Sequence, residues 1–338
     1  MRRFLSPAWL AAIAVMLVAI VAFVLWVTPS NDYILLPDKP HSVSPLVTVE
    51  HPRSAGADDG GIYFLAVVVR KASLLERTFP WLREGATLVP ADALRTPGIS
   101  DAAQRRIDAR DMSLSQRIAA AVALRELGYE VVTRRSGVRI SSVIGGTPAV
   151  GKLTPTDVVV SLDGKHVGSP SELRQLMADR RPGNVVRLGV RDSHGLRTVR
   201  IRTVADPHQP SHAVIGVLID QAAQIKLPFR VTIDPGNVVG PSAGLAFALE
   251  VMEKLGRNVD RGYKVAATGE LELDGSVLPI GAVRQKAIEA KDAHVDILLV
   301  PAGDNAAVAR KDAGDVKVIA VQSFQQALRK LATMPQQG

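Results

Sequence analysis

The stretch from Asn237 to Leu245 constrains this chain more than any other feature of its sequence. It reads Asn-Val-Val-Gly-Pro-Ser-Ala-Gly-Leu and places Ser242 on a glycine-flanked turn. An apolar run over residues 245–255 follows at once and is typical of a buried helix. The sequence therefore predicts a serine hydroxyl presented at the start of a helix.

Lys286 follows Ser242 after 44 positions (286 minus 242). A serine hydroxyl is a poor nucleophile until a neighbouring base removes its proton. A lysine serves as that base only if burial lowers its pKa enough to leave the amine neutral. The apolar sequence around both residues favours such burial, and we predict a Ser–Lys hydrolytic dyad. The alternative is a helix-capping serine and a solvated lysine.

Two further motifs lie between these residues. Thr268, Gly269 and Glu270 form the first, and Val-Leu-Pro-Ile-Gly at residues 277–281 forms the second. Taken in this order, the motifs over residues 228–321 resemble the proteolytic domain of the Lon protease family. The resemblance implies that Ser242 is the nucleophile, that Lys286 is the general base and that Thr268 bonds near the lysine.

The same resemblance assigns supporting positions around the nucleophile. These are Gly240, Pro241, Ala243 and Glu270. Two residues depart from the family's pattern. Val239 stands where many members carry an acidic residue, and Ala282 stands where the second glycine of Pro-Ile-Gly-Gly is usual. Neither departure removes a member of the predicted dyad.

Residues 136–205 have a different texture, with short strands, an Asp-Gly turn and one amphipathic helix over residues 169–179. Their order resembles a bacterial-type PDZ domain. Such domains capture an extended peptide by adding it as a strand to a sheet edge. The resemblance implies a peptide-binding loop at Gly137, Val138, Arg139 and Ile140. The alternative is a PDZ domain that serves only as a spacer.

Residues 8–27 are twenty consecutive residues without a charge. A helix of this length spans ~30 Å, which matches the hydrocarbon core of a bilayer. Arg2 and Arg3 precede the run, so the positive-inside rule predicts a cytoplasmic N-terminus and an extracytoplasmic body. A cleaved signal peptide is the alternative. The length of the run and the lack of an Ala-x-Ala site favour a retained, single-pass anchor.

The sequence is divided into five parts by these features. We expect a cytoplasmic tip and anchor at 1–28, a linker at 29–45, an N-terminal part of the protease domain at 46–135, the PDZ domain at 136–205 and the Lon-type catalytic domain at 206–334. A strand over 61–69 and a helix over 112–127 resemble early elements of the Lon domain. We therefore predict an α/β (α+β) protease domain interrupted by a small β-rich PDZ domain.

Several function classes are excluded by composition. The chain has no cysteine, so disulfide scaffolds and thiolate chemistry are absent. The net charge of +8 is spread along the chain without aromatic interleaving, which argues against nucleic-acid binding. No histidine pair has metal-ligand spacing, and His212 has no acid in a recognisable place to support a Ser–His pair. No metal and no cofactor are expected.

Residues 146–153 nearly spell a phosphate-binding loop, but Leu153 lacks the hydroxyl that would hold Mg²⁺. We therefore expect an ATP-independent serine endopeptidase of the cell membrane that acts on protein or peptide substrates. The alternatives are a catalytically silent PDZ scaffold and a protein that cleaves its own chain once. The Lon resemblance also implies a homo-oligomeric ring, although the sequence shows no interface.

Overall fold

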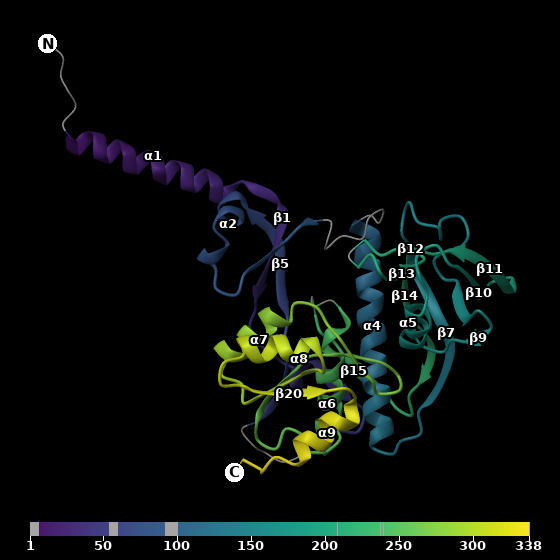
Figure 1. Cartoon of the computed structure of the whole chain (residues 1–338). Coiled ribbons are helices and arrows are strands. Elements are labelled where there is room, and N and C mark those ends of the chain that lie inside the picture. Colours follow the sequence, from purple (N-terminus) through teal and green to yellow (C-terminus); the bar gives the residue numbers. More distant parts are fainter. Residues whose placement is uncertain are drawn as a thin grey trace.

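The computed structural model describes residues 7–53, 60–91, 101–207, 209–236, 238 and 240–337. The fold is mixed α/β, with helices and sheets contributed by both halves of the chain (Figure 1). The helices are α1 Pro7–Val27, α2 Leu74–Thr78, α4 Asp101–Glu126, α5 Pro170–Ala178, α6 Gly244–Lys254, α7 Val283–Asp292, α8 Asp304–Asp312 and α9 Phe324–Ala332.

A five-stranded sheet forms the centre of the larger body, in the order β2-β4-β16-β19-β20. The strands are β2 His41–Ser42, β4 Gly61–Phe64, β16 Lys264–Ala267, β19 Ile297–Pro301 and β20 Lys317–Val321. Strand β4 pairs in parallel with β16 although about 200 residues separate them (264 minus 61). Segments on both sides of residues 136–205 thus build one sheet.

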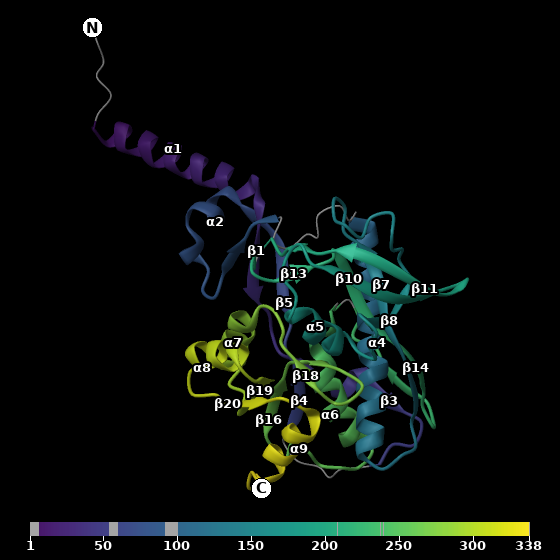
Figure 2. The same ribbon diagram turned by 45° about the vertical axis from the view of Figure 1, so that its right-hand side comes forward.

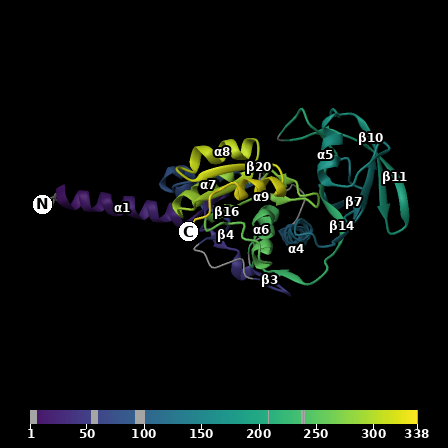
Figure 3. The ribbon, with the colours of Figure 1, turned by 90° about the horizontal axis from the view of Figure 1, so that it is seen from below.

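Side chains of this sheet alternate between two apolar layers. Val265 and Ala267 belong to one core with residues of α4, α6 and α9, and Phe64 meets Phe247 there with ring centroids 6.0 Å apart. Ala266 belongs to the other core, with residues of α7 and α8. Helices therefore cover both faces of the sheet, and the helix that follows Ser242 is buried in the middle (Figure 3).

A second sheet has the order β11-β10-β8-β7-β14, with the short β9 beside β8. The strands are β7 Val132–Val143, β8 Val158–Leu162, β9 Lys165–His166, β10 Val185–Asp192, β11 Gly195–Arg202 and β14 Val217–Lys226. They enclose an apolar core with α5 that is separate from the two cores above. Figure 2 shows this sheet lying beside α4. The predicted PDZ elements are all present in the predicted order.

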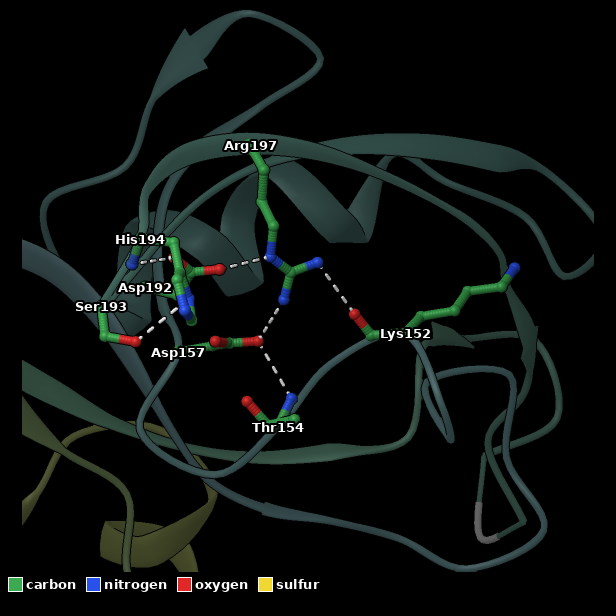
Figure 4. A network of polar contacts seen from close by, with 7 residues as sticks. All are labelled: Lys152, Thr154, Asp157, Asp192, Ser193, His194 and Arg197. Carbon is green, nitrogen blue, oxygen red and sulfur yellow. Dashed lines mark hydrogen bonds and ion pairs between the residues drawn. The ribbon is translucent and has the colours of Figure 1, made fainter.

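Polar contacts at one end of this sheet fix its hairpin (Figure 4). The guanidinium of Arg197 donates to Asp157 at 2.7 Å and to Asp192 at 2.8 Å. Asp157 also accepts from the N–H of Thr154 at 2.9 Å. Because Asp157 is buried, this network satisfies a charge that would otherwise be costly in the domain interior. Its role is structural.

The remaining strands complete the fold, and they differ from two of the sequence predictions. A three-stranded sheet has the order β5-β1-β6. The remaining strands are β1 Pro29–Pro37, β3 Val47–Val49, β5 Val67–Ser73, β6 Thr87–Val89, β12 Val204–Ala205, β13 Ala213–Val214, β15 Val231–Ile233, β17 Glu270–Leu271 and β18 Val277–Leu278. The predicted linker at 29–45 is thus largely strand, and the predicted strand over 61–69 is two strands in different sheets.

Two helix starts within residues 72–110 are not marked by the sequence patterns above. Ser73 and Glu76 form a reciprocal capping box that starts α2. Helix α4 begins at Asp101 rather than Met112. Its first turns lack the apolar periodicity that marks its second half, so the pattern alone could not locate the start. Residues 92–100 lie outside the described part of the chain.

Helix α1 projects away from the rest of the molecule in all three views (Figures 1–3). Trp9 and Trp26 near its ends are both exposed. Among the residues that the structure describes, no helix is long and apolar enough to cross a membrane. The side chains of residues 8 and 10, which belong to the predicted span, lie outside the described part of the chain. Membrane anchoring through residues 8–27 therefore stays a prediction.

Candidate active site

Ser242 lies in a single 3₁₀ turn, Pro241–Ala243, that leads directly into α6. Gly240 precedes it with a φ of 101°, which a residue with a side chain rarely adopts. Ala243 is buried, and the hydroxyl of Ser115 on α4 donates to the carbonyl of Pro241 at 3.2 Å. The turn is thus held from below by the core and from one side by α4.

The segment between β16 and β17 holds the nucleophile turn from the other side. The N–H of Gly269 donates to the carbonyl of Ser242 at 2.7 Å, and the N–H of Leu245 donates to the carbonyl of Gly269 at 3.1 Å. The hydroxyl of Thr268 also donates to the Ser242 carbonyl, at 3.2 Å. The Thr-Gly-Glu motif therefore positions the serine backbone as well as contributing a side chain.

The structure brings Lys286 to Ser242. Lys286 lies in the first turns of α7, and its Nζ donates to Oγ of Ser242 at 2.8 Å and to Oγ1 of Thr268 at 3.0 Å. Lys286 is only 4% exposed and Thr268 is fully buried. Three residues that are separate in the sequence thus converge through one amine.

Burial changes the acid–base behaviour of this amine. Desolvation lowers the pKa of Lys286 to about 8, and the charge of Glu289 offsets part of the decrease. About a tenth of a group with this pKa is neutral at pH 7, and half is neutral at pH 8. A neutral amine 2.8 Å from a hydroxyl can accept its proton. The geometry and the protonation state both suit a general base.

Glu289 is a feature that the sequence predictions missed. It lies one helical turn after Lys286 and is 1% exposed, and neither of its carboxylate oxygens has a well-formed hydrogen bond. Burial raises its pKa to about 8, while the nearby Ala66 N–H and Lys286 offset part of the rise and Asp38 adds to it. A glutamate three positions after the lysine is visible in the sequence, but its burial is not.

Glu270 lies apart from the dyad. Desolvation raises the pKa of its carboxyl, as do the charges of Glu272 and Asp220, and Arg174 acts in the opposite direction. Glu270 lines a cavity together with Pro241, one residue before the nucleophile. The described contacts give it no bond to Ser242 or Lys286.

The predicted peptide-binding loop requires a correction. Gly137, Val138, Arg139 and Ile140 lie inside β7, which pairs with β14 on one side and with β8 on the other. The N–H and carbonyl of Ile140 also bond across to residues 156–157. Because a strand paired on both sides has no edge to offer, an added peptide cannot pair there. The terminal strands of this sheet are β11 and β14.

The two departures from the Lon pattern have different outcomes. Val239, like Asn237, lies outside the described residues. Ala282 is the residue before α7 and has a φ of 55°, in the left-handed region. Glycine adopts this conformation without the steric cost that a Cβ imposes. The glycine usual at this position in the family therefore has a backbone reason, and Ala282 tolerates the strain.

Two rejected alternatives remain rejected in the structure. Residues 146–153 form turns between β7 and β8 and do not open a helix, as a phosphate-binding loop would. His212 lies in the turn before β13, whereas the hydroxyl of Ser242 accepts from Lys286. Within the described residues, no group of three or more His, Asp or Glu side chains could hold a metal ion.

Comparison with known families agrees with this geometry. Residues 224–333 match the model of the Lon protease (S16) C-terminal proteolytic domain, and residues 126–203 match the PDZ domain model. This chain carries a Lon-type proteolytic domain. The Lon-type match contains Ser242, Thr268 and Lys286, and the PDZ match lies between the strands β4 and β16 of its central sheet.

Individual relatives are similar over short parts of the chain. Lon protease 2 of Bacillus subtilis (strain 168) is 32% identical over 116 residues, which is 34% of this chain and 20% of the relative. Lon protease 1 of Herpetosiphon aurantiacus is 45% identical over 62 residues, which is 18% of this chain and 8% of the relative. The chain thus spans a fifth or less of the length of these curated relatives.

Among solved structures, the PDZ domain of an SdrC-like protein from Listeria monocytogenes is 24% identical, with a TM-score of 0.24. That likeness covers 26% of this chain and 90% of the solved domain. A corresponding domain from Listeria innocua is 25% identical, with a TM-score of 0.23. At these TM-scores the likeness carries no argument, and the PDZ assignment comes from the family match.

Thr268 provides the first test of the site. Replacing it by valine keeps the shape but removes the hydroxyl that bonds both Lys286 and the Ser242 carbonyl. We expect kcat/KM for peptide cleavage to fall by about 10–100-fold, since each lost bond to a charged or buried group costs roughly 1–3 kcal/mol. Thr268→Ser, which keeps the hydroxyl, should retain most activity. A valine variant as active as wild type would remove Thr268 from the site.

Glu289 provides the second test of the site. The negative charge of Glu289 raises the pKa of Lys286. Because the pKa of Glu289 is itself raised to about 8, that charge is only partly present below pH 8, and Glu289→Gln should lower the pKa of Lys286 by a small amount. We expect the acid limb of the pH–rate profile to move to lower pH. Activity at pH 7 should rise by less than about tenfold, because about a tenth of the amine is already neutral there. Asp292→Asn, an exposed change on the same helix, should leave the profile in place; a shift toward higher pH in Glu289→Gln would refute this role.

Proposed function

We propose that this chain is an ATP-independent serine endopeptidase that uses a Ser242–Lys286 dyad. The observation that carries the proposal is the 2.8 Å contact between Nζ of a buried lysine and Oγ of the serine. In the proposed reaction, neutral Lys286 accepts the Ser242 proton while Oγ attacks the scissile carbonyl. The resulting ammonium then protonates the leaving amine, and the neutral amine later activates water.

Backbone groups near Ser242 support the same reaction. The nucleophile turn opens α6, whose first N–H groups carry the positive end of the helix dipole. When Oγ of Ser242 bonds to the scissile carbonyl carbon, the carbonyl oxygen becomes an oxyanion, which would lie at this end. Fixed N–H donors in a site with little water stabilise such charge strongly. The buried Thr268 hydroxyl completes the site by holding both the amine and the serine carbonyl.

We further propose that residues 46–135 and 206–334 form one discontinuous protease domain with the PDZ domain, residues 136–205, inserted. The pairing of β4 with β16 supports this division. A direct bond links the two parts: the hydroxyl of Ser171 on α5 donates to Glu272 at 2.6 Å, and its N–H donates to the same carboxylate at 3.2 Å. A peptide held by the PDZ domain would therefore lie against the protease domain.

Membrane anchoring through residues 8–27 is part of the proposal, with the N-terminus cytoplasmic and the catalytic part extracytoplasmic. The uncharged sequence and the projection of α1 from the body support it. The full-length chain should stay in the membrane pellet after alkaline carbonate extraction, and a chain lacking residues 1–28 should not. Release of the full-length chain by carbonate would remove the anchor from the proposal.

The function is tested by cleavage of an unfolded protein without ATP. We expect the full-length chain in detergent to cleave it and Ser242→Ala to be inactive. A folded wild-type chain that binds peptides without cleaving them would favour the scaffold alternative. A single shift in the chain's own mass that is lost in Ser242→Ala would favour self-processing. Assembly into a ring stays a prediction from the Lon resemblance.

A further inference from the structure

A cavity lies between the PDZ part and the nucleophile turn. Its volume is about 180 Å³, and a cavity of ~150 Å³ is enough to hold a six-carbon ring. Residues of α5 and β14 line one side, and Pro241, next to Ser242, lines the other together with β17 and the residue after it. A side chain of a polypeptide in the active site could reach into this space.

The cavity is rich in hydrogen-bond acceptors. Four carboxylates and one guanidinium line it: Asp111, Asp220, Glu270, Glu272 and Arg174. Their formal sum is −3, from four negative charges and one positive charge. Arg174 is exposed and makes no ion pair within 4 Å among the described contacts. Asp111 has a partner of its own. The other three carboxylates outnumber the one guanidinium, so the lining still offers negative charge that its own residues do not neutralise.

Two buried acceptors in the lining have no partner. Oδ2 of Asp220 and Oε1 of Gln221 are inaccessible and, within the described part of the chain, accept no hydrogen bond. Gln221 is 7% exposed, and its amide nitrogen already donates to the carbonyls of Gly137 and Gly168, so its oxygen is left over. Buried polar atoms are normally paired, and unpaired acceptors call for a donor.

Burial also affects two neighbouring carboxyls of the lining. Desolvation raises the pKa of Glu270 and of Glu272, and in each the charge of another carboxylate adds to the rise. A cation in the cavity would relieve both effects, since an opposite charge within about 4–6 Å favours the ionised carboxylate. Lysine and arginine side chains carry only donors and a positive charge.

We propose that this cavity binds the side chain of a lysine or arginine in the polypeptide that occupies the active site. The inference rests on the proposed endopeptidase function, because it names a side chain of its substrate. It makes Asp220 and Gln221, which lie on β14 at the edge of the PDZ sheet, determinants of cleavage specificity. Substrate choice would then be shared between the two parts at their junction.

The first experiment measures cleavage preference. The full-length chain is given a mixture of peptides that vary around the scissile bond, and the products are sequenced by mass spectrometry. Lysine and arginine should be enriched at one position relative to the cut. Asp220→Asn should reduce kcat/KM about tenfold or more for the arginine peptide, but not for the same peptide with uncharged citrulline. Asp315→Asn, the same change at an exposed remote site, should alter neither rate.

The second experiment separates this inference from the proposed function. Binding of decapeptides to the full-length Ser242→Ala chain is followed by fluorescence anisotropy, with one arginine or citrulline moved along the peptide. One arginine position should bind about tenfold more tightly than its citrulline counterpart, and Asp220→Asn should abolish the difference. If this binding result is obtained but the wild-type chain cleaves no substrate, the side-chain pocket is supported and the proposed peptidase function is rejected.

Equal binding of arginine and citrulline peptides at every position would overturn the inference, as would a preference that Asp220→Asn leaves intact. Loss of fold is checked by thermal unfolding. Because Oδ2 of Asp220 is buried without a partner, Asp220→Asn should unfold at the same or a higher temperature than wild type.

Discussion

Replacing Lys286 by methionine is expected to reduce kcat/KM for protein cleavage by about 10⁴-fold or more, the scale seen when one member of a catalytic unit is removed. Methionine fills similar space without an amine, so the proton of Ser242 has no acceptor at 2.8 Å. Lys286→Arg should be equally inactive, because a guanidinium stays charged at any working pH. The rates are measured with one fluorogenic peptide for all variants.

The two substitutions differ in their effect on folding, which provides the control. Lys286 is 4% exposed, so methionine removes a buried amine, whereas arginine adds a permanent buried charge. We expect Lys286→Met to unfold at a temperature close to that of wild type and Lys286→Arg to unfold at a lower one. An active Lys286→Met variant would exclude lysine as the base.

Activity should depend steeply on pH because the base titrates in the working range. Desolvation lowers the pKa of Lys286 to about 8. The amine is active when neutral, so kcat/KM should rise about tenfold per pH unit from pH 6 to pH 7.5 and level off above pH 8.5. At pH 6 about 1% of the plateau rate should remain, since a group two units below its pKa is ~1% neutral.

The substrate for this profile should have no group that titrates between pH 6 and pH 9. Circular dichroism at each pH shows whether the fold persists. The group near the amine that could share the titration is Glu289, whose pKa is raised to about 8. A rate that does not change between pH 6 and pH 9 would contradict a lysine base.

The residues of the proposed dyad could be located in the sequence because their motifs are local. Gly240 and Pro241 define the turn before Ser242, and α6 follows from an uninterrupted apolar run. The sequence does not show how close two distant segments lie in the folded chain. The 2.8 Å contact of Ser242 with Lys286 depends on both α6 and α7 packing against the central sheet. The resemblance to the Lon family supplied that link.

The peptide-binding edge could not be located in the same way. Residues 137–140 read as an ordinary half-buried strand, and nothing nearby shows that β14, 80 residues later, pairs with them (217 minus 137). For the same reason, the sequence did not show that residues 61–69 form two strands rather than one. Their apolar composition is continuous, but Gly61–Phe64 and Val67–Ser73 pair in different sheets. Strand pairing between distant segments decides such cases.

Glu289 shows a limit of another kind. Helix α7 carries charged residues at several positions, and only the packed structure shows that Glu289 and Lys286 are buried whereas Asp292 is exposed. Composition gives no warning that a glutamate will be placed beside the base. The pKa of that base therefore cannot be predicted from the motif alone, although its identity can.

The most direct test of the dyad uses the absence of cysteine from this chain. Lys286→Cys introduces a unique thiol, which is alkylated with bromoethylamine in denaturant and refolded, giving an amine at nearly the position of the lost Nζ. The same thiol capped with a methylthio group is the uncharged control. We predict no cleavage by the unmodified or methylthio chain and restored cleavage by the aminoethylated one. Cleavage by the methylthio chain, or a folded aminoethylated chain that stays inactive, would contradict a lysine base at position 286.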